Sequence, residues 1–212
     1  GMIQIVSNII MKGGKVLTRN TIIHRRQGDM DGACAVYSVM MCLLRLGYVN
    51  KSDLEVYNLA DKRKRKGKLL YELLENNGLI KSGFGFIELK KEIERLTNGD
   101  IKISRKAPRN QDKNVQLITD LIDKDIAPII SVDWAFEGAH ALFAIGYEAD
   151  ADGIITKILC LDPGAVTPEV SSWNCYLEVQ NTDGEYPIKH VAINQNTARC
   201  KLSDMLILEL SN

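Results

Sequence analysis

The stretch from residue 33 to residue 46, ACAVYSVMMCLLRL, is apolar on nearly every side, and Gly47 follows it directly. Glycine after an apolar run is typical of a helix C-terminus. A helix that is apolar all round is a buried helix. We therefore expect residues 33–46 to form a helix that runs through the middle of the domain.

The residues on either side of position 125 show different patterns. Four segments before it have helical spacing with one apolar face: 53–60, 68–76, 86–96 and 115–123. Five short segments after Pro128 are rich in β-branched, aliphatic or aromatic residues: 129–134, 139–147, 154–162, 173–179 and 205–210. Residues 2–11 are expected to be extended. Helices grouped before strands predict an α+β fold, with a helical N-terminal half packed on a C-terminal antiparallel β-sheet.

The length of 212 residues and the hydrophobic content of 45% fit one domain with a substantial core. We expect a single domain over residues 2–212, with a helical subdomain at about 20–125 and a β subdomain at about 126–212. The working crevice is expected between these two parts, because two-sided chemistry needs groups from both.

Charge and composition exclude several classes of function. The 27 basic and 27 acidic side chains cancel, so no overall field draws the protein to nucleic acid or to an anionic membrane. The basic run Lys62–Lys66 is interpreted as a solvated surface. No segment approaches the roughly 20 apolar residues of a spanning helix, and the residues after Met2 lack the features of a secretory signal. With Gly1 taken as the scar of a removed tag, a cytoplasmic location is expected.

The five cysteines are odd in number and irregularly spaced, which favours reduced thiols over a disulfide framework. Cysteine and histidine residues also lack the spacing of a zinc site, with Cys160, Cys175, His190 and Cys200 dispersed along the chain. We predict no metal and no cofactor. A free, reactive cysteine is chemically permitted.

Cys34 is the best candidate for such a cysteine. A polar, glycine-containing segment, Gln27 to Gly32, leads directly into the apolar run and puts Cys34 in the first turn of the expected helix. A helix N-terminus lowers the pKa of a thiol, and its free backbone N–H groups can bind an oxyanion. The amide of Gln27 is a second oxyanion donor. The alternative is that Cys34 is a small buried hydrophobic residue.

His140 and Asp162 are the candidate partners of Cys34. His140 is the only polar side chain inside an apolar strand, whereas His24 and His190 have no comparable setting. If residue 147 pairs with residue 154 in a hairpin, His140 lies opposite residue 161 and Asp162 is one position away. A base histidine needs its second ring nitrogen held, commonly by a carboxylate. The alternatives are a packed core histidine and a turn-forming aspartate.

The order of these residues resembles that of a known family. Gln27 before Cys34, His140-Ala141 leading to Gly146-Tyr147, and Asp162-Pro163-Gly164 resemble the Gln, Cys, His and Asp/Asn elements of papain-like cysteine peptidases. The closest branch is the bacterial C39-like peptidases that cleave leader peptides after double glycine, with their stand-alone relatives. The resemblance implies a papain-like (cysteine proteinase) fold. The Gln27-to-Cys34 spacing departs from the family by one extra residue, and no Trp follows Cys34.

These observations predict a thiol hydrolase that cleaves a peptide or isopeptide bond through an acyl-enzyme. Cys34 would be the nucleophile, His140 the base, Asp162 the residue that orients the base, and Gln27 an oxyanion donor. The expected partner is a peptide or protein substrate, and the sequence makes no prediction of the oligomeric state. Two alternatives stay open: an acyl transferase with the same triad, and a catalytically silent module that binds a peptide in the cleft.

Overall fold

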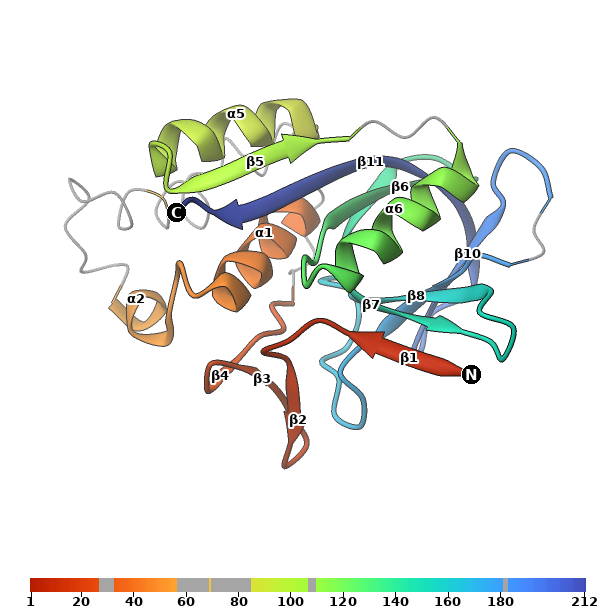
Figure 1. Cartoon of the computed structure of the whole chain (residues 1–212), viewed down its shortest axis with the longest axis horizontal. Helices are drawn as coiled ribbons and strands as arrows, with labels where there is room; N and C mark the ends of the chain where they lie inside the picture. The colour runs from red at the N-terminus through yellow and green to blue at the C-terminus, as the bar shows by residue number, and fades with distance from the viewer. Residues whose placement is uncertain (27–32, 57–68, 70–84, 107–109, 181–182) are drawn as a thin grey trace.

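Antiparallel strands dominate the chain in the computed structural model, which describes residues 1–26, 33–56, 69, 85–106, 110–180 and 183–212 (Figure 1). The strands are β1 (Met2–Ile5), β2 (Ile10–Lys12), β3 (Lys15–Thr18), β4 (Thr21–Ile22), β5 (Ile101–Arg105), β6 (Ile129–Trp134), β7 (Ala139–Ala149), β8 (Ile155–Leu161), β9 (Cys175–Glu178), β10 (Ile188–Ala192) and β11 (Ala198–Leu210). The helices are α1 (Ala33–Leu46), α2 (Lys51–Val56), α5 (Phe86–Thr97) and α6 (Gln111–Asp123).

Six strands close into an antiparallel barrel in the order β7-β6-β11-β10-β9-β8, because β8 pairs back on β7. Two long strands make the closure possible. β7 pairs with β6 over its first five residues and with β8 over the rest. On the edge where the pairing with β6 ends, the last residues of β7 pair with β1. Leu206 of β11 pairs with both Ile129 of β6 and Arg105 of β5, so β5 extends the sheet on the side of β11 opposite β6.

This architecture shows that the expected α+β fold, papain-like with a helical N-terminal half packed on a C-terminal sheet, is wrong. The described chain is mostly sheet with few helices, and β5, from the half expected to be helical, pairs with β11. Local patterns reveal elements but not their pairing partners, so closure of the ring was not foreseen. The segments 101–105 and 188–192 were also missed, because each is only five residues long.

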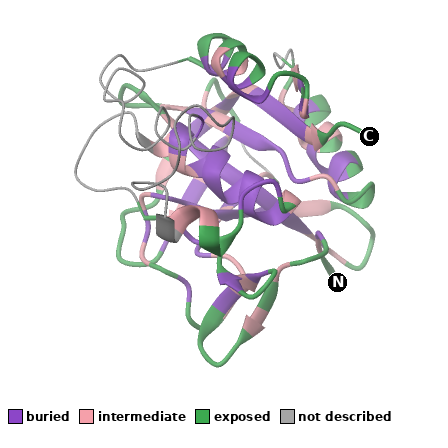
Figure 2. Ribbon diagram, turned by 90° about the vertical axis from the view of Figure 1, so that its left-hand side faces the viewer, coloured by how far each residue is buried: buried purple, intermediate pink, exposed green. Residues whose placement is uncertain are grey.

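Helix α1 has the expected bounds and is buried along almost its whole length (Figure 2). It lies against β7, β6 and β11 on the outside of the ring. Its one charged residue, Arg45, is buried near the C-terminus, where it donates to the Ser7 carbonyl at 3.0 Å and forms an ion pair with Asp125 at 2.9 Å. A buried charge must be paired in this way, so Arg45 ties α1 to the N-terminal segment and to the end of α6.

The other expected helices are found in part. Segments 86–96 and 115–123 correspond to α5 and α6, and segment 53–60 corresponds to α2 as far as residue 56. The helix expected at 68–76 and the basic run at 62–66 lie outside the described residues, apart from the buried, helical Leu69. Across the described ranges, none of the helices has the length and apolar character needed to cross a membrane.

The hairpin that carries the candidate site residues has a different register from the expected one. Tyr147 pairs with Ile158, not with residue 154, and the ladder contains two irregularities, one of them between Ala144 and Gly146. Five residues, 150–154, join the strands, with Gly153 in the left-handed region and the Asp150 carboxylate accepting from two backbone N–H groups. The register thus differs from the expected one by three to four positions, and Asp162 directly follows the last residue of β8.

Residue 146 must be glycine, because β1 packs too closely against it to leave room for a side chain. A β-carbon at this position would lie 2.4 Å from the Gln4 carbonyl oxygen and 2.6 Å from the Ile5 side chain. Gly146→Ala should therefore displace β1 and lower the free energy of unfolding by about 1–3 kcal/mol. Urea unfolding measures this loss, and amide exchange should speed up in β1 while β8 stays protected. An unchanged unfolding midpoint would contradict the placement of β1.

Candidate active site

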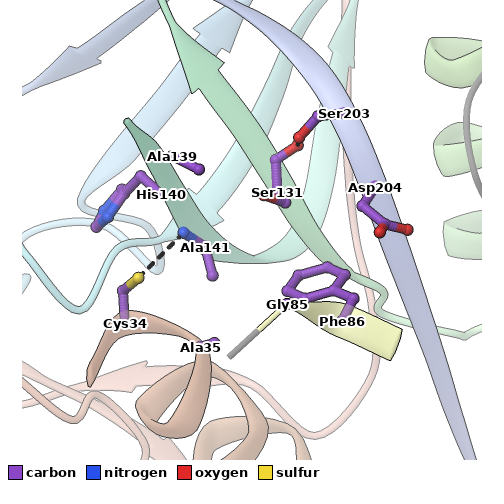
Figure 3. Close-up of a pocket in the computed structure, with 10 residues that line it drawn as sticks. All are labelled: Cys34, Ala35, Gly85, Phe86, Ser131, Ala139, His140, Ala141, Ser203 and Asp204. Atoms are coloured by element: carbon purple, nitrogen blue, oxygen red, sulfur yellow. Dashed lines mark hydrogen bonds between the residues drawn. The ribbon is translucent and has the colours of Figure 1, made fainter. Parts of the chain in front are cut away.

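Cys34 is the second residue of α1, and its sulfur faces the beginning of β7 (Figure 3). The Sγ atom accepts hydrogen bonds from the backbone N–H groups of Ala141, at 3.4 Å, and of Ala35. Cys34 is partly exposed, whereas the other four cysteines are buried free thiols. It is therefore the one cysteine in the chain that combines access to solvent with N–H donors aimed at its sulfur.

His140, the second residue of β7, joins Cys34 to Asp162. Its Nε2 donates to Asp162 Oδ1 at 2.6 Å. His140 also lies close enough to Cys34 for each residue to shift the pKa of the other. Since Nε2 is occupied by Asp162, Nδ1 is the ring nitrogen left for the thiol. The imidazole is thus held at one nitrogen and faces a nucleophile at the other, as a catalytic base requires.

Asp162 is 1% exposed, and both of its carboxylate oxygens are engaged. Oδ1 accepts from His140 and from the backbone N–H of Gly164, at 2.6 and 2.7 Å, while Oδ2 accepts from His190 Nε2 at 2.8 Å. The main chain of Asp162 is held as well, by Asn174 at its N–H and by His24 and Asn174 at its carbonyl. The carboxylate therefore has no freedom to turn.

Each ionised group of the triad favours the ionised form of the group beside it. Burial alone would raise the pKa of Cys34, but the hydrogen bond and charge of His140 hold the pKa of the thiol below its usual value. Burial alone would lower the pKa of His140, but Asp162 and Cys34 raise it to about 10. Burial also opposes ionisation of Asp162, yet its two histidine partners hold the pKa of its carboxyl well below the usual range. These directions favour a thiolate and an imidazolium side by side.

A cavity of about 460 Å³ opens beside Cys34 (Figure 3). Its lining comes from the N-terminal ends of α1 and α5 and from β7, β6 and β11. Ala141, Ser131 and Asp204 lie directly opposite one another on these three strands, so they form one row that leads away from Cys34. Strands are spaced by about 4.8 Å, so the row is roughly 10 Å long. A groove of small side chains thus begins at the thiol.

An irregularity in β11 shapes the far end of this groove. The register between β11 and β6 shifts between Leu202 and Asp204, which leaves Ser203 as the extra residue of a bulge. Bulges redirect side chains and are common beside active sites. Here the Ser203 hydroxyl donates to the Ser131 carbonyl, and Asp204 forms an ion pair with Arg105 at 2.9 Å. The groove is consequently apolar beside Phe86 and polar at its end.

The structure brings together three of the four residues predicted for the site. His140 is hydrogen-bonded to Asp162, and Cys34 lies on the other side of His140, close enough for the two to shift each other's pKa. The expected hydrogen bond from His140 to Asp162, through the nitrogen that does not face Cys34, is confirmed. Gln27 lies outside the described residues, so its role as an oxyanion donor stays a prediction.

Sequence reasoning missed His190, which was judged to have no comparable setting. It lies in β10 with Ile188 and Ala192 buried on the same side of the strand. The alternation in Ile188-Lys189-His190-Val191-Ala192 could have indicated an inward-facing histidine. Trp134 stacks on the His140 ring at 5.7 Å between centroids and on the exposed Phe136 at 5.5 Å. The Trp134 ring therefore covers one face of the His140 imidazole.

The fold also gathers groups that could hold a metal ion. Ligand atoms of Asp162, Cys175 and His190 lie within 4.8 Å of one another, and all three residues are buried. Cys175 and His190, which are dispersed along the chain, therefore lie close together in space. Burial and the neighbouring Cys160 raise the pKa of Cys175 well above its usual value, which favours the thiol over the thiolate that a metal needs. A metal bound here would also have to replace the hydrogen bond between His190 Nε2 and Oδ2 of Asp162.

Gly164 provides a sharp test of this geometry. A β-carbon at residue 164 would lie 3.2 Å from Asp162 Oδ1 and 3.3 Å from His140 Cε1, so Gly164→Ala should press the pair apart. We expect a fold that melts within a few degrees of wild type and a Cys34 alkylation rate that falls about tenfold at a pH below the wild-type midpoint, a loss worth one pKa unit. Gly153→Ala, in the distant hairpin turn, is the control. Equal alkylation rates in Gly164→Ala and wild type would contradict the close packing.

In comparisons with protein-family models and with curated proteins, nothing matches this chain. The case for a function therefore rests on the geometry of Cys34, His140 and Asp162 and on the cavity beside them.

Proposed function

We propose that this protein is a thiol hydrolase that cleaves a peptide or isopeptide bond through an acyl-enzyme on Cys34. The observation that carries the proposal is that His140, which is hydrogen-bonded to Asp162, lies beside Cys34 in the lining of one cavity, where each of the two shifts the pKa of the other. Its order of residues supports a link to papain-like, C39-like peptidases in chemistry. Five free thiols support a reducing compartment such as the cytoplasm.

The proposed reaction begins when His140 takes the Cys34 proton, and the thiolate attacks the carbonyl carbon of the scissile bond. A C–S bond forms, and the carbonyl oxygen becomes an oxyanion near the free N–H groups at the start of α1. When the tetrahedral intermediate collapses, the imidazolium gives its proton to the leaving amine. Water, deprotonated by His140, then attacks the thioester and releases the acid and the thiol.

The row from Ala141 through Ser131 to Asp204 supports an extended peptide as the substrate. Small side chains let a main chain lie close to the sheet, and the volume of about 460 Å³ falls within the usual range of ligand sites. An acyl transferase would use the same thioester but resolve it with an amine. A silent module would use the groove without the chemistry.

Covalent labelling tests the proposal directly. A peptide vinyl sulfone should add once per chain at Cys34, and the four buried cysteines should stay unmodified, as peptide mass mapping would reveal. Cys34→Ala should fold normally, because alanine is well tolerated near a helix start, and should neither take label nor hydrolyse peptides. Wild-type protein that takes no label would favour the silent module. A product that changes on addition of an amine would favour the transferase.

The groove can be tested apart from the triad. Ser131→Phe places an aromatic ring in the groove between Ala141 and Asp204, so kcat/KM for a peptide substrate should fall more than tenfold, a loss above about 1.4 kcal/mol. Alkylation of Cys34 by iodoacetamide should barely change, because this small reagent does not need the groove. Ser104→Phe, on the half-buried strand β5, is the matched control. Equal peptide turnover in the two variants would place the substrate elsewhere.

A further inference from the structure

We propose that His190 is a positioning residue of this site, whose Nε2–H holds Oδ2 of Asp162 so that Oδ1 stays aimed at His140. The inference rests on the proposed function, since it concerns the same triad. His190 is 2% exposed, and its Nε2 lies 2.8 Å from Asp162 Oδ2. Its ring stands edge-on to His140, with centroids 6.2 Å apart, and to Trp134, at 5.0 Å.

The geometry separates the role of His190 from that of the other groups around Asp162. His24 and Asn174 contact only the main chain of Asp162, at its N–H and carbonyl. Gly164 contributes a backbone donor on the His140 side, to Oδ1. In the described part of the structure, His190 is the only side chain that donates a hydrogen bond to Oδ2. Without it, one oxygen of a buried carboxylate would have no partner, and the carboxylate could rotate away from His140.

His190 therefore acts on Cys34 through two other residues, Asp162 and His140. A carboxylate that stays ionised and correctly oriented favours the imidazolium form of His140, and this in turn favours the thiolate of Cys34. The titratable groups that face His190 are Asp162 at the end of β8 and His140 on β7, with Cys175 on β9 close by. Cys160 and Cys200 interact with Cys175 and not with the triad base.

Glutamine and asparagine at position 190 differ in the one property that matters. The amide nitrogen of glutamine corresponds to Nε2 of histidine and can reach Asp162, whereas that of asparagine corresponds to Nδ1 and falls short. The measurement is the rate of Cys34 alkylation by iodoacetamide as a function of pH, followed by intact mass. This rate reports the thiolate and needs no substrate, so the test does not depend on knowing what the protein cleaves.

We expect the rise in alkylation rate to occur about one pH unit higher in His190→Asn than in wild type, which is a roughly tenfold slower reaction at any pH below both midpoints. His190→Gln should recover most of this loss. His24 is a buried histidine that contacts only the main chain of Asp162, so His24→Gln should show the same dependence of alkylation rate on pH as wild type. Should His190→Asn not fold, His190→Met, of similar size but without a donor, takes its place.

Three results would overturn the inference. The first is a His190→Asn profile that superimposes on that of wild type, and the second is a His24→Gln shift as large as the His190→Asn shift. The third is a stoichiometric metal in the purified protein, since the same groups would then serve as ligands. A wild-type thiol that titrates at its ordinary pKa would instead refute the proposed function. In ¹H–¹⁵N spectra of wild-type protein, His190 should carry its proton on Nε2, and a bare Nε2 would also refute the positioning role.

Discussion

A carboxylate that is almost completely removed from water, that of Asp162, is the group on which the rest of the site depends. Removing an unpaired charge from water costs several kcal/mol, so this side chain is tolerable only where donors surround it. His140, His190 and the Gly164 N–H provide those donors to its two oxygens. They come from β7, from β10 and from the turn after β8. The closed ring brings these three segments to one place.

The ring and α1 contribute different halves of the chemistry. The ring holds the base and the carboxylate, while α1, packed on its outer face, presents the thiol at a helix N-terminus. Neither part alone contains a solvent-accessible thiol beside a base. The groove of small residues across β7, β6 and β11 begins where the two parts meet, so the proposed acyl-enzyme would form at the contact between them. This dependence explains why packing at Gly164 and Gly146 matters.

Local patterns predicted the candidate residues more successfully than the fold. Residues 33–46 and 129–134 form elements with the predicted bounds, because continuous apolar runs fix an element without reference to its partners. Cys34, His140 and Asp162 were identified because each is a reactive side chain at the end of such a run. The closed ring and the register of β7 with β8 depend on irregularities in the ladder, which no local pattern encodes. His190 was missed with its short strand, and Gln27 lies outside the described residues.

Ultraviolet difference titration of wild type against Cys34→Ala is the most direct measurement of the central claim, because it follows the absorbance of the Cys34 thiolate alone. The account predicts a thiolate that persists below the usual pH range of a free thiol, because His140, whose own pKa is raised by Asp162, stabilises it. It also predicts that Asp162→Ala moves this titration upward. A wild-type difference curve that rises only at or above the ordinary thiol pKa of about 8.5 would contradict the account.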